Sequence, residues 1–142
     1  MDDNFYACVD HLLYGQEGAI AILKTIAPLQ RKIKWKHFHC KHIQVRYGES
    51  HVVPINEPMP LSDEDLAEIQ SLLPYIREKL SGTWEKDAYR KEMLCAAEGI
   101  CLMAELYAKL DGREVKRLVD ADKWMADYAA NWRRTNKESE LR

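Results

Sequence analysis

The amino-acid sequence predicts a mainly α-helical bundle built around a long antiparallel helical hairpin. Apolar side chains recur every three to four residues across residues 83–132, which is the spacing of one buried helix face. Residues 110–113 interrupt this pattern with a turn so short that the helices on either side become antiparallel neighbours. With 46% hydrophobic and 31% charged residues, the 142-residue chain falls in the globular class and suits a single helical domain over residues 1–142.

The first helical region is predicted over residues 4–28, as two short helices joined near Gly15. One apolar stripe precedes Gly15 and a second follows Gly18, and glycine inside a helix weakens it. Asp10 and His11 stand among the apolar positions. Both are polar, so we expect them at the surface.

Residues 33–53 alternate apolar with polar side chains, which is the period of an extended chain. The alternation is clear at Ile33 and Trp35 and returns at Ile43 and Val45. The prolines that follow before residue 61 prevent regular structure. We therefore expect a short extended or β segment here, acting as a linker or docking segment between helical regions.

The next helix is predicted to start at Ser62 and to end near residue 80. Ser62 is a helix-capping residue, and the helix dipole favours the three carboxylates of Asp63, Glu64 and Asp65 in the first turn. Paired carboxylates are also candidates for general acid and base, but the helix start explains these three. We assign them no catalytic role.

Within the hairpin, the first helix is expected to begin with Thr83 as its cap and to end at Gly112. Asp111 and Glu114 have the spacing of a capping box, which predicts that the second helix starts at Asp111. Cys95 and Cys101 lie on the first helix six residues apart, too far to pair, and we expect both in the core.

Charge and hydropathy exclude several functions. The net charge of −2 and the pI of about 6.2 give no basic surface for a nucleic acid or an acidic membrane. No stretch approaches the ~20 apolar residues of a membrane span, and the start of the chain lacks the pattern of a secretory signal. The four cysteines form no Cys-x-x-Cys pair, which is typical of free thiols in a reducing compartment, so we expect a cytoplasmic protein.

The chain has one cluster of side chains that are common metal ligands, at His37, His39, Cys40 and His42. On a strand, the first two would lie on one face and the last two on the other, so at most two ligands converge without help from elsewhere. Lysines crowd the same segment and disfavour a cation, so a solvated basic strand or a surface for an acidic partner is the favoured interpretation. No phosphate-binding loop or His-Glu-x-x-His motif occurs, and we expect no cofactor.

The last third of the chain carries short motifs that resemble a known family. Residues 96–100 are Ala-Ala-Glu-Gly-Ile, residues 110–112 are Leu-Asp-Gly, and residues 131–141 are Asn-Trp-Arg-Arg-Thr-Asn-Lys-Glu-Ser-Glu-Leu. Together they resemble the C-terminal helical region of bacterial glycoside hydrolases of the β-N-acetylhexosaminidase type (family 20). There a long helix often ends in Trp-x-x-x-Asn-(Lys/Arg)-x-Ser-(Glu/Gly)-Leu. The matching residues here are Trp132, Asn136, Lys137, Ser139, Glu140 and Leu141.

The resemblance implies a domain that follows a (β/α)₈ barrel and packs beside it. In that family the barrel carries the Asp-Glu catalytic pair and the substrate pocket. This chain is too short to contain such a barrel, so no catalytic residue is carried over onto it. The histidine-rich segment at residues 31–47 has no counterpart in the resemblance.

We therefore expect a noncatalytic accessory domain of a glycoside hydrolase, part of a longer multidomain protein. Trp124 and Trp132 are expected at the interface with the catalytic domain of the same parent protein or with a subunit of a homo-oligomer. The first alternative is a freestanding helical interaction module whose basic segment binds an acidic partner. Its lysines are Lys32, Lys34, Lys36 and Lys41. The second alternative is a regulator that binds metal through the histidine and cysteine cluster.

Overall fold

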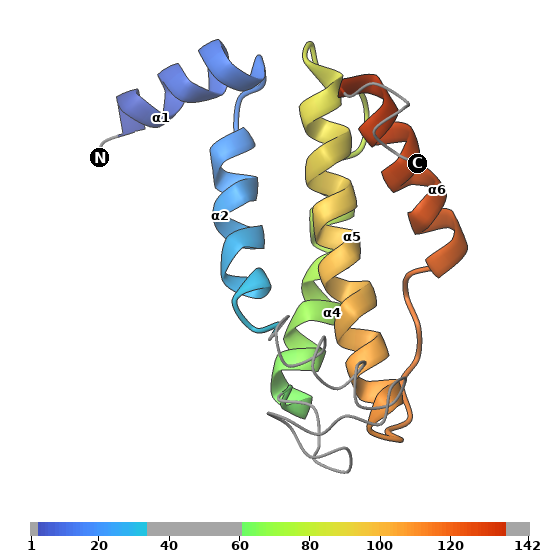
Figure 1. The fold of residues 1–142 in the computed structure, drawn as a ribbon. Helices are drawn as coiled ribbons and strands as arrows, with labels where there is room; N and C mark the ends of the chain where they lie inside the picture. Colours follow the sequence, from blue (N-terminus) through green and yellow to red (C-terminus); the bar gives the residue numbers. More distant parts are fainter. Residues whose placement is uncertain (1–2, 34–60, 136–142) are drawn as a thin grey trace, which may run out of the picture.

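All regular structure in the residues that the computed structural model describes, 3–33 and 61–135, is helical (Figure 1). The elements in chain order are α1 (Asp3–Val9), the π-helix η1 (Asp10–Tyr14), α2 (Ala19–Gln30), α4 (Asp63–Lys79), α5 (Asp87–Leu110) and α6 (Ala121–Thr135). The prediction of a mainly α-helical bundle is therefore confirmed. The extended segment expected over residues 33–53 lies outside the described residues except for Ile33, which is buried just beyond α2.

The central helix of the bundle is α5. It packs against α4, while α2 and α6 lie on either side of it, and α6 runs in the opposite direction to α5 (Figure 1). The most deeply buried side chains come from α4 and α5, and include Ile69, Leu73, Ile76, Cys101 and Tyr107. Burying each large apolar side chain stabilises a fold by roughly 1.5–3 kcal/mol. The core therefore lies mainly where α4 meets α5.

Cys95 and Cys101 are buried free thiols, as the sequence predicted. Burial, reinforced by the neighbouring Glu105 carboxylate, raises the pKa of the Cys101 thiol to about 12. Desolvation by burial also raises the pKa of Cys95. Because the thiolate is the reactive form, both cysteines serve as small core residues rather than as nucleophiles.

The N-terminal region forms two helical segments joined at Gly15, as predicted, but Asp10 was wrongly placed at the surface. Its carboxylate is buried, and it accepts hydrogen bonds from the backbone N–H groups of Gly18 (2.9 Å) and Ile20 (2.8 Å). These amides lie at the start of α2, where a helix has no backbone partners for its N–H groups. Asp10 thus caps α2 from a preceding helix, while His11 is exposed as expected.

The start of α4 follows the sequence prediction. The Ser62 hydroxyl accepts a hydrogen bond from the Asp65 N–H (3.0 Å), as a helix cap should. The carboxylates of the first turn also hold neighbouring elements. Asp65 pairs with Lys32 (2.8 Å), and Asp63 with Arg113 (3.0 Å). Helix capping and these ion pairs therefore account for the carboxylates at the start of α4.

The start of α5 differs from the prediction, because the helix begins at Asp87 and not beside Thr83. The Asp87 carboxylate accepts a hydrogen bond from the Trp84 N–H (3.0 Å) and pairs with the Arg90 guanidinium. Arg90 in turn donates to the Leu80 carbonyl (3.0 Å) at the end of α4. The corner between α4 and α5 is therefore closed by a charged pair on α5.

The connection after α5 was predicted correctly at the end of α5, where Gly112 stops the helix, and wrongly at the start of the next helix. Asp111 ends α5 instead of starting the next helix, and Gly112 adopts a left-handed conformation with φ of +74°. The Arg113 N–H donates to the Ala108 carbonyl (2.9 Å) and the Gly112 N–H to the Lys109 carbonyl (3.0 Å), which is the Schellman pattern of a helix end. The second helix of the hairpin starts only at Ala121, capped by Asp120 through the Lys123 N–H (3.1 Å).

A buried carboxylate explains why the chain stays non-helical up to Asp120. Glu105 is 1% exposed and accepts hydrogen bonds from the backbone N–H of Leu118 (2.8 Å) and from the Gln70 side chain (2.7 Å). Arg77 of α4 donates to the Leu118 carbonyl (3.2 Å). The side chains of α4 and α5 thus take the backbone groups that a helix would otherwise use, and the segment before α6 is pinned to the bundle.

We expect Glu105→Ala to lower the free energy of unfolding by about 3 kcal/mol, because it leaves the partly buried N–H of Leu118 and the buried N–H of Val119 without their charged acceptor. Glu105→Gln keeps the shape and one acceptor, so its cost should be about 1–2 kcal/mol. Urea denaturation measures both, and hydrogen exchange at the Leu118 amide locates the effect. Glu114→Ala, an exposed site in the same connection, is the control. Equal effects of Glu105→Ala and Glu114→Ala would contradict this role.

The corner at Asp87 should make stability depend on pH. The Arg90 side chain, and then the Trp84 amide, hold the pKa of Asp87 well below its usual value of 3.8. A lowered pKa stabilises the fold above that usual value, and this stabilisation is lost as the pH falls below it. The stability difference between the wild type and Asp87→Asn should therefore be largest near neutral pH and shrink below pH 3.8. Denaturation curves at several pH values test this, with Asp122→Asn at the exposed start of α6 as the control.

Candidate functional site

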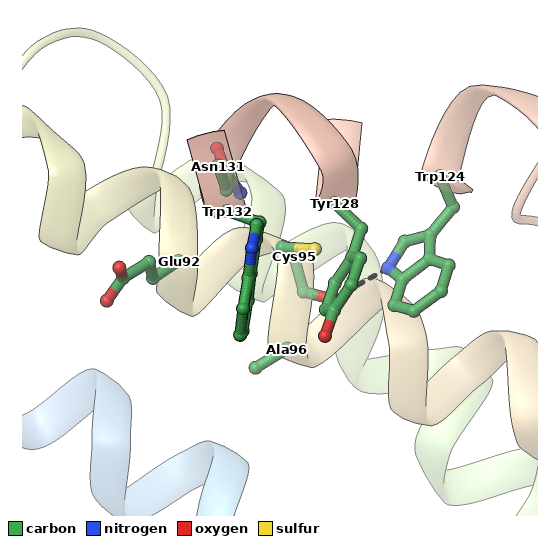
Figure 2. A pocket seen from close by; sticks show the side chains of 7 residues that line it. All are labelled: Glu92, Cys95, Ala96, Trp124, Tyr128, Asn131 and Trp132. Atoms are coloured by element: carbon green, nitrogen blue, oxygen red, sulfur yellow. Dashed lines mark hydrogen bonds between the residues drawn. The ribbon is translucent and has the colours of Figure 1, made fainter. Parts of the chain in front are cut away.

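An aromatic face of α6 lies over α5 and carries Trp124, Tyr128 and Trp132 at four-residue intervals (Figure 2). The rings of Trp124 and Tyr128 stack with centroids 5.4 Å apart and an interplanar angle of 26°. The Trp124 Nε1 donates a hydrogen bond to the Cys95 carbonyl of α5 (2.8 Å). This bond fixes the position of α6 on α5, because the indole can reach the carbonyl only from one register.

The close contact between the two helices depends on a glycine. A Cβ atom built on Gly99 would lie 2.8 Å from Cζ2 of Trp124, closer than real Cβ contacts occur. Gly99 therefore leaves the space that the Trp124 ring occupies. A small residue at such a position lets a neighbouring helix come close. Here it lets the Trp124 ring of α6 lie directly against the backbone of α5.

A pocket of about 410 Å³ opens between α5 and α6 beside these rings. In Figure 2, the rings of Tyr128 and Trp132 both extend from α6 toward Ala96 of α5. The residues that line the pocket are Glu92, Cys95, Ala96, Trp124, Tyr128, Asn131 and Trp132. Its wall is mostly apolar, with the Glu92 carboxylate at one end.

A second pocket of about 240 Å³ continues the first along α5, because Ala96 and Trp124 line both. It extends to Met103 and is bounded on the α2 side by Gln30. From Glu92 to Met103, the α5 surface spans roughly 16 Å at 1.5 Å per residue. We call this continuous surface, between α2 and α6 and with α5 as its floor, the aromatic groove.

The structure brings the two predicted interface residues into this groove. Trp124 and Trp132 are half-buried rather than fully exposed, and Trp124 packs against Gly99 of α5. Their role at an interface stays a prediction. Sequence reasoning missed Ala96 and Gly99 as part of the floor of the groove. The available signal was the spacing of small residues at Ala96 and Gly99, three positions apart on one helix.

The predicted metal ligands, His37, His39, Cys40 and His42, lie outside the described residues. Within residues 3–33 and 61–135, no group of three or more His, Cys, Asp or Glu side chains is arranged to hold a metal ion. In the same part of the chain, no helix is long and apolar enough to cross a membrane.

The chain was compared with models of known protein families, with characterised proteins and with solved structures, and none of them matches it.

Gly99→Ala should destabilise the protein by about 1–2 kcal/mol, because the new methyl group must displace the Trp124 ring. The same substitution in a Trp124→Ala background meets no ring, and it should stabilise the helix by up to about 1 kcal/mol through helix propensity alone. A double-mutant cycle of urea denaturation curves measures this change of sign. If Gly99→Ala has the same effect in both backgrounds, the glycine is not needed for the tryptophan.

Proposed function

We propose that this chain is a noncatalytic helical docking module, the C-terminal accessory domain of a glycoside hydrolase of the β-N-acetylhexosaminidase type. The observation that carries the proposal is the aromatic groove, an open apolar surface built from the tryptophan and tyrosine rings of α6. Tryptophan and tyrosine are the residues most enriched among the energetically important contacts of interfaces. A groove of this length and composition suits an apolar element of a partner.

The chemistry of the groove favours docking over glycoside hydrolysis. Hydrolysis of a glycoside typically needs two carboxylates on either side of the scissile bond. The described lining of the groove offers the Glu92 carboxylate among apolar side chains. Glu105, the buried carboxylate of α5, is occupied with backbone and side-chain donors of the bundle. A single carboxylate in the groove and a second one bonded within the bundle support a packing role for the module.

The position of the terminal motif supports the choice of parent protein. Trp132 is the first residue of the pattern that resembles the hexosaminidase C-terminal region, and it lines the aromatic groove. The remaining matched positions, 136–141, lie outside the described residues. In a module that packs beside a barrel, a tryptophan at this place would meet the neighbouring domain.

The alternative of a basic docking segment gains no support from the described residues. Lys32, the first lysine of that segment, pairs with Asp65 (2.8 Å) and Glu68 (3.1 Å) of α4. It therefore ties α2 to α4, and its charge is already neutralised by the bundle. Lys34, Lys36 and Lys41 lie outside the described residues.

The purified chain should not release nitrophenol from 4-nitrophenyl N-acetyl-β-D-glucosaminide above the rate in buffer, and its gene should encode a barrel with an Asp-Glu pair upstream. The separately expressed barrel should bind the chain, and Trp132→Ala should weaken that binding by about tenfold or more. Calorimetry measures the affinity. Met125→Ala is the matched control, since Met125 is 58% exposed on α6 but does not line the groove.

Two results would overturn the proposal. The first is hydrolysis by the chain alone that is lost when its own carboxylates are substituted. The second is a gene that encodes no barrel beside these residues.

A further inference from the structure

The aromatic groove carries a single charge in its described lining, and that charge is negative. Glu92 is the one charged side chain among the described residues that line the pocket of about 410 Å³, and the described lining of the adjoining pocket has none. Glu92 is exposed, and it makes no hydrogen bond or ion pair within residues 3–33 and 61–135. The groove therefore favours a cation over an anion.

The basic side chains nearest to Glu92 belong to a different pocket. Lys91 and Arg134 line a pocket of about 270 Å³ together with the carboxylates of Glu98 and Asp127. Successive residues of a helix point about 100° apart, so Lys91 and Glu92 contribute to different sides of the contact between α5 and α6. The charges of that other pocket largely balance one another, and Glu92 sets the charge of the aromatic groove.

The groove also presents the face of an aromatic ring next to this carboxylate. In Figure 2, the Tyr128 ring lies between the rings of Trp124 and Trp132 and extends toward Ala96. Trp124 stacks on Tyr128 with ring centroids 5.4 Å apart, so the other face of Tyr128 is turned toward the Glu92 end of the pocket. The face of an aromatic ring attracts a cation within about 6 Å of its centroid. A cation placed here meets an aromatic face and a carboxylate in one pocket.

The lining of the pocket selects the kind of cation. A primary ammonium group is strongly hydrated and donates three hydrogen bonds. The Cys95 carbonyl already accepts the Trp124 Nε1–H (2.8 Å), and the Asn131 amide donates to the Lys91 carbonyl (3.3 Å). A primary ammonium would therefore lose more hydration than this lining replaces. A quaternary ammonium group spreads its charge over methyl groups, needs no hydrogen bonds, and is the cation that aromatic sites recognise.

We propose that the pocket between α5 and α6 binds a small molecule that carries a quaternary ammonium group. The group lies against the face of Tyr128 that Trp124 leaves uncovered, beside the Glu92 carboxylate. The volume of about 410 Å³ is in the range of small-molecule sites. The inference goes beyond the proposed docking function and does not rest on it. A trimethylated lysine of a protein carries the same chemical group, so the test must separate the two sources.

Choline is the probe, titrated into the nitrogen-15-labelled chain at constant ionic strength. The indole N–H signals of Trp124 and Trp132 should shift saturably, with a Kd of about 1 mM. The signal of Trp84, which is buried between α4 and α5, is the internal control and should not move. The neutral isostere 3,3-dimethylbutan-1-ol, with carbon in place of nitrogen, should bind about fivefold more weakly or less. Equal affinity for the two molecules, or no saturable shift with choline, would overturn the proposal.

Substitutions of Tyr128 test the role of its ring. Tyr128→Leu removes the ring and should weaken choline binding by about fivefold or more, whereas Tyr128→Phe keeps the ring and should stay within about twofold of the wild type. Tyr75→Leu is the matched control, because Tyr75 is 48% exposed on α4 and Tyr128 is 46% exposed on α6. Circular dichroism checks the fold of each variant. A Tyr128→Leu chain that binds choline like the wild type would overturn the proposed position of the cation.

Two further substitutions test the charge and the space. Glu92→Gln should weaken choline binding by about threefold, and Glu114→Gln, at an exposed site outside the groove, should not. Ala96→Leu fills the floor of the pocket, leaves the rings and the charge in place, and should abolish binding. Both Glu92 and Ala96 are exposed, so the fold should survive their substitution. Binding that is unchanged in both variants would lie elsewhere on the chain and would overturn the proposal.

A short peptide that contains trimethyllysine separates the two sources of the group. Choline that binds at least as tightly as this peptide supports a small-molecule ligand. A peptide that binds about tenfold more tightly would keep the ammonium site but overturn the small-molecule source. The docking function fails separately, since it is measured by binding of the catalytic barrel. A chain that binds choline and no barrel would support the ammonium site alone.

Discussion

The arrangement of this bundle depends on the buried carboxylate of Glu105. It accepts the Leu118 N–H at 2.8 Å, and the carbonyl of the same residue accepts Arg77 of α4 at 3.2 Å. These bonds decide where the chain leaves the bundle surface and where Asp120 caps the next helix. Because an unpaired buried charge is costly, the Glu105 carboxylate keeps its donors in place. The position of Leu118 therefore determines where α6 starts. The four-residue spacing of the α6 aromatics then places Trp124 over Gly99.

The groove follows from a difference in side-chain size between the two helices. Beside the rings, α5 offers the small residues Ala96 and Gly99, with the larger Met103 further along the groove, while α6 offers large aromatic rings. Trp124 is satisfied by its hydrogen bond to the Cys95 carbonyl and by stacking on Tyr128. The outer faces of the rings and the small residues between them remain open. A well-packed hairpin and an open apolar surface therefore arise from the same residues.

The features predicted from the sequence are those set by neighbours along the chain. Ser62 caps α4, and Cys101 enters the core, because a capping residue or a helical period identifies them locally. Asp10 and Glu105 were not recognised as buried, since their partners are amides eight to fourteen residues away and no local pattern shows such pairing. The start of the second helix was predicted too early for a related reason. Val119 is apolar at a helical spacing and is buried in the core, but the backbone around it is not helical. Trp124 was predicted at an interface because it is a large aromatic residue on an amphipathic helix. In the structure its ring packs against Gly99 and bonds to the Cys95 carbonyl, and its role at an interface stays a prediction.

The apolar side chains of α1 and η1 are exposed because Asp10 must accept the first N–H groups of α2. Cradling the first amides of α2 brings the Asp10 carboxylate inward, and the π-helical turn of η1, closed at Gly15 with its N–H on the Asp10 carbonyl, accommodates this. Once Asp10 faces α2, the direction of α1 is set, and Leu12 is turned toward solvent. Replacing this carboxylate by an apolar residue would leave the partly buried N–H groups of Gly18 and Ile20 without their acceptor, so α1 and η1 could fold back on the bundle only by weakening the start of α2. The geometry therefore keeps the side chains of Leu12 and Leu13 away from the core of the bundle.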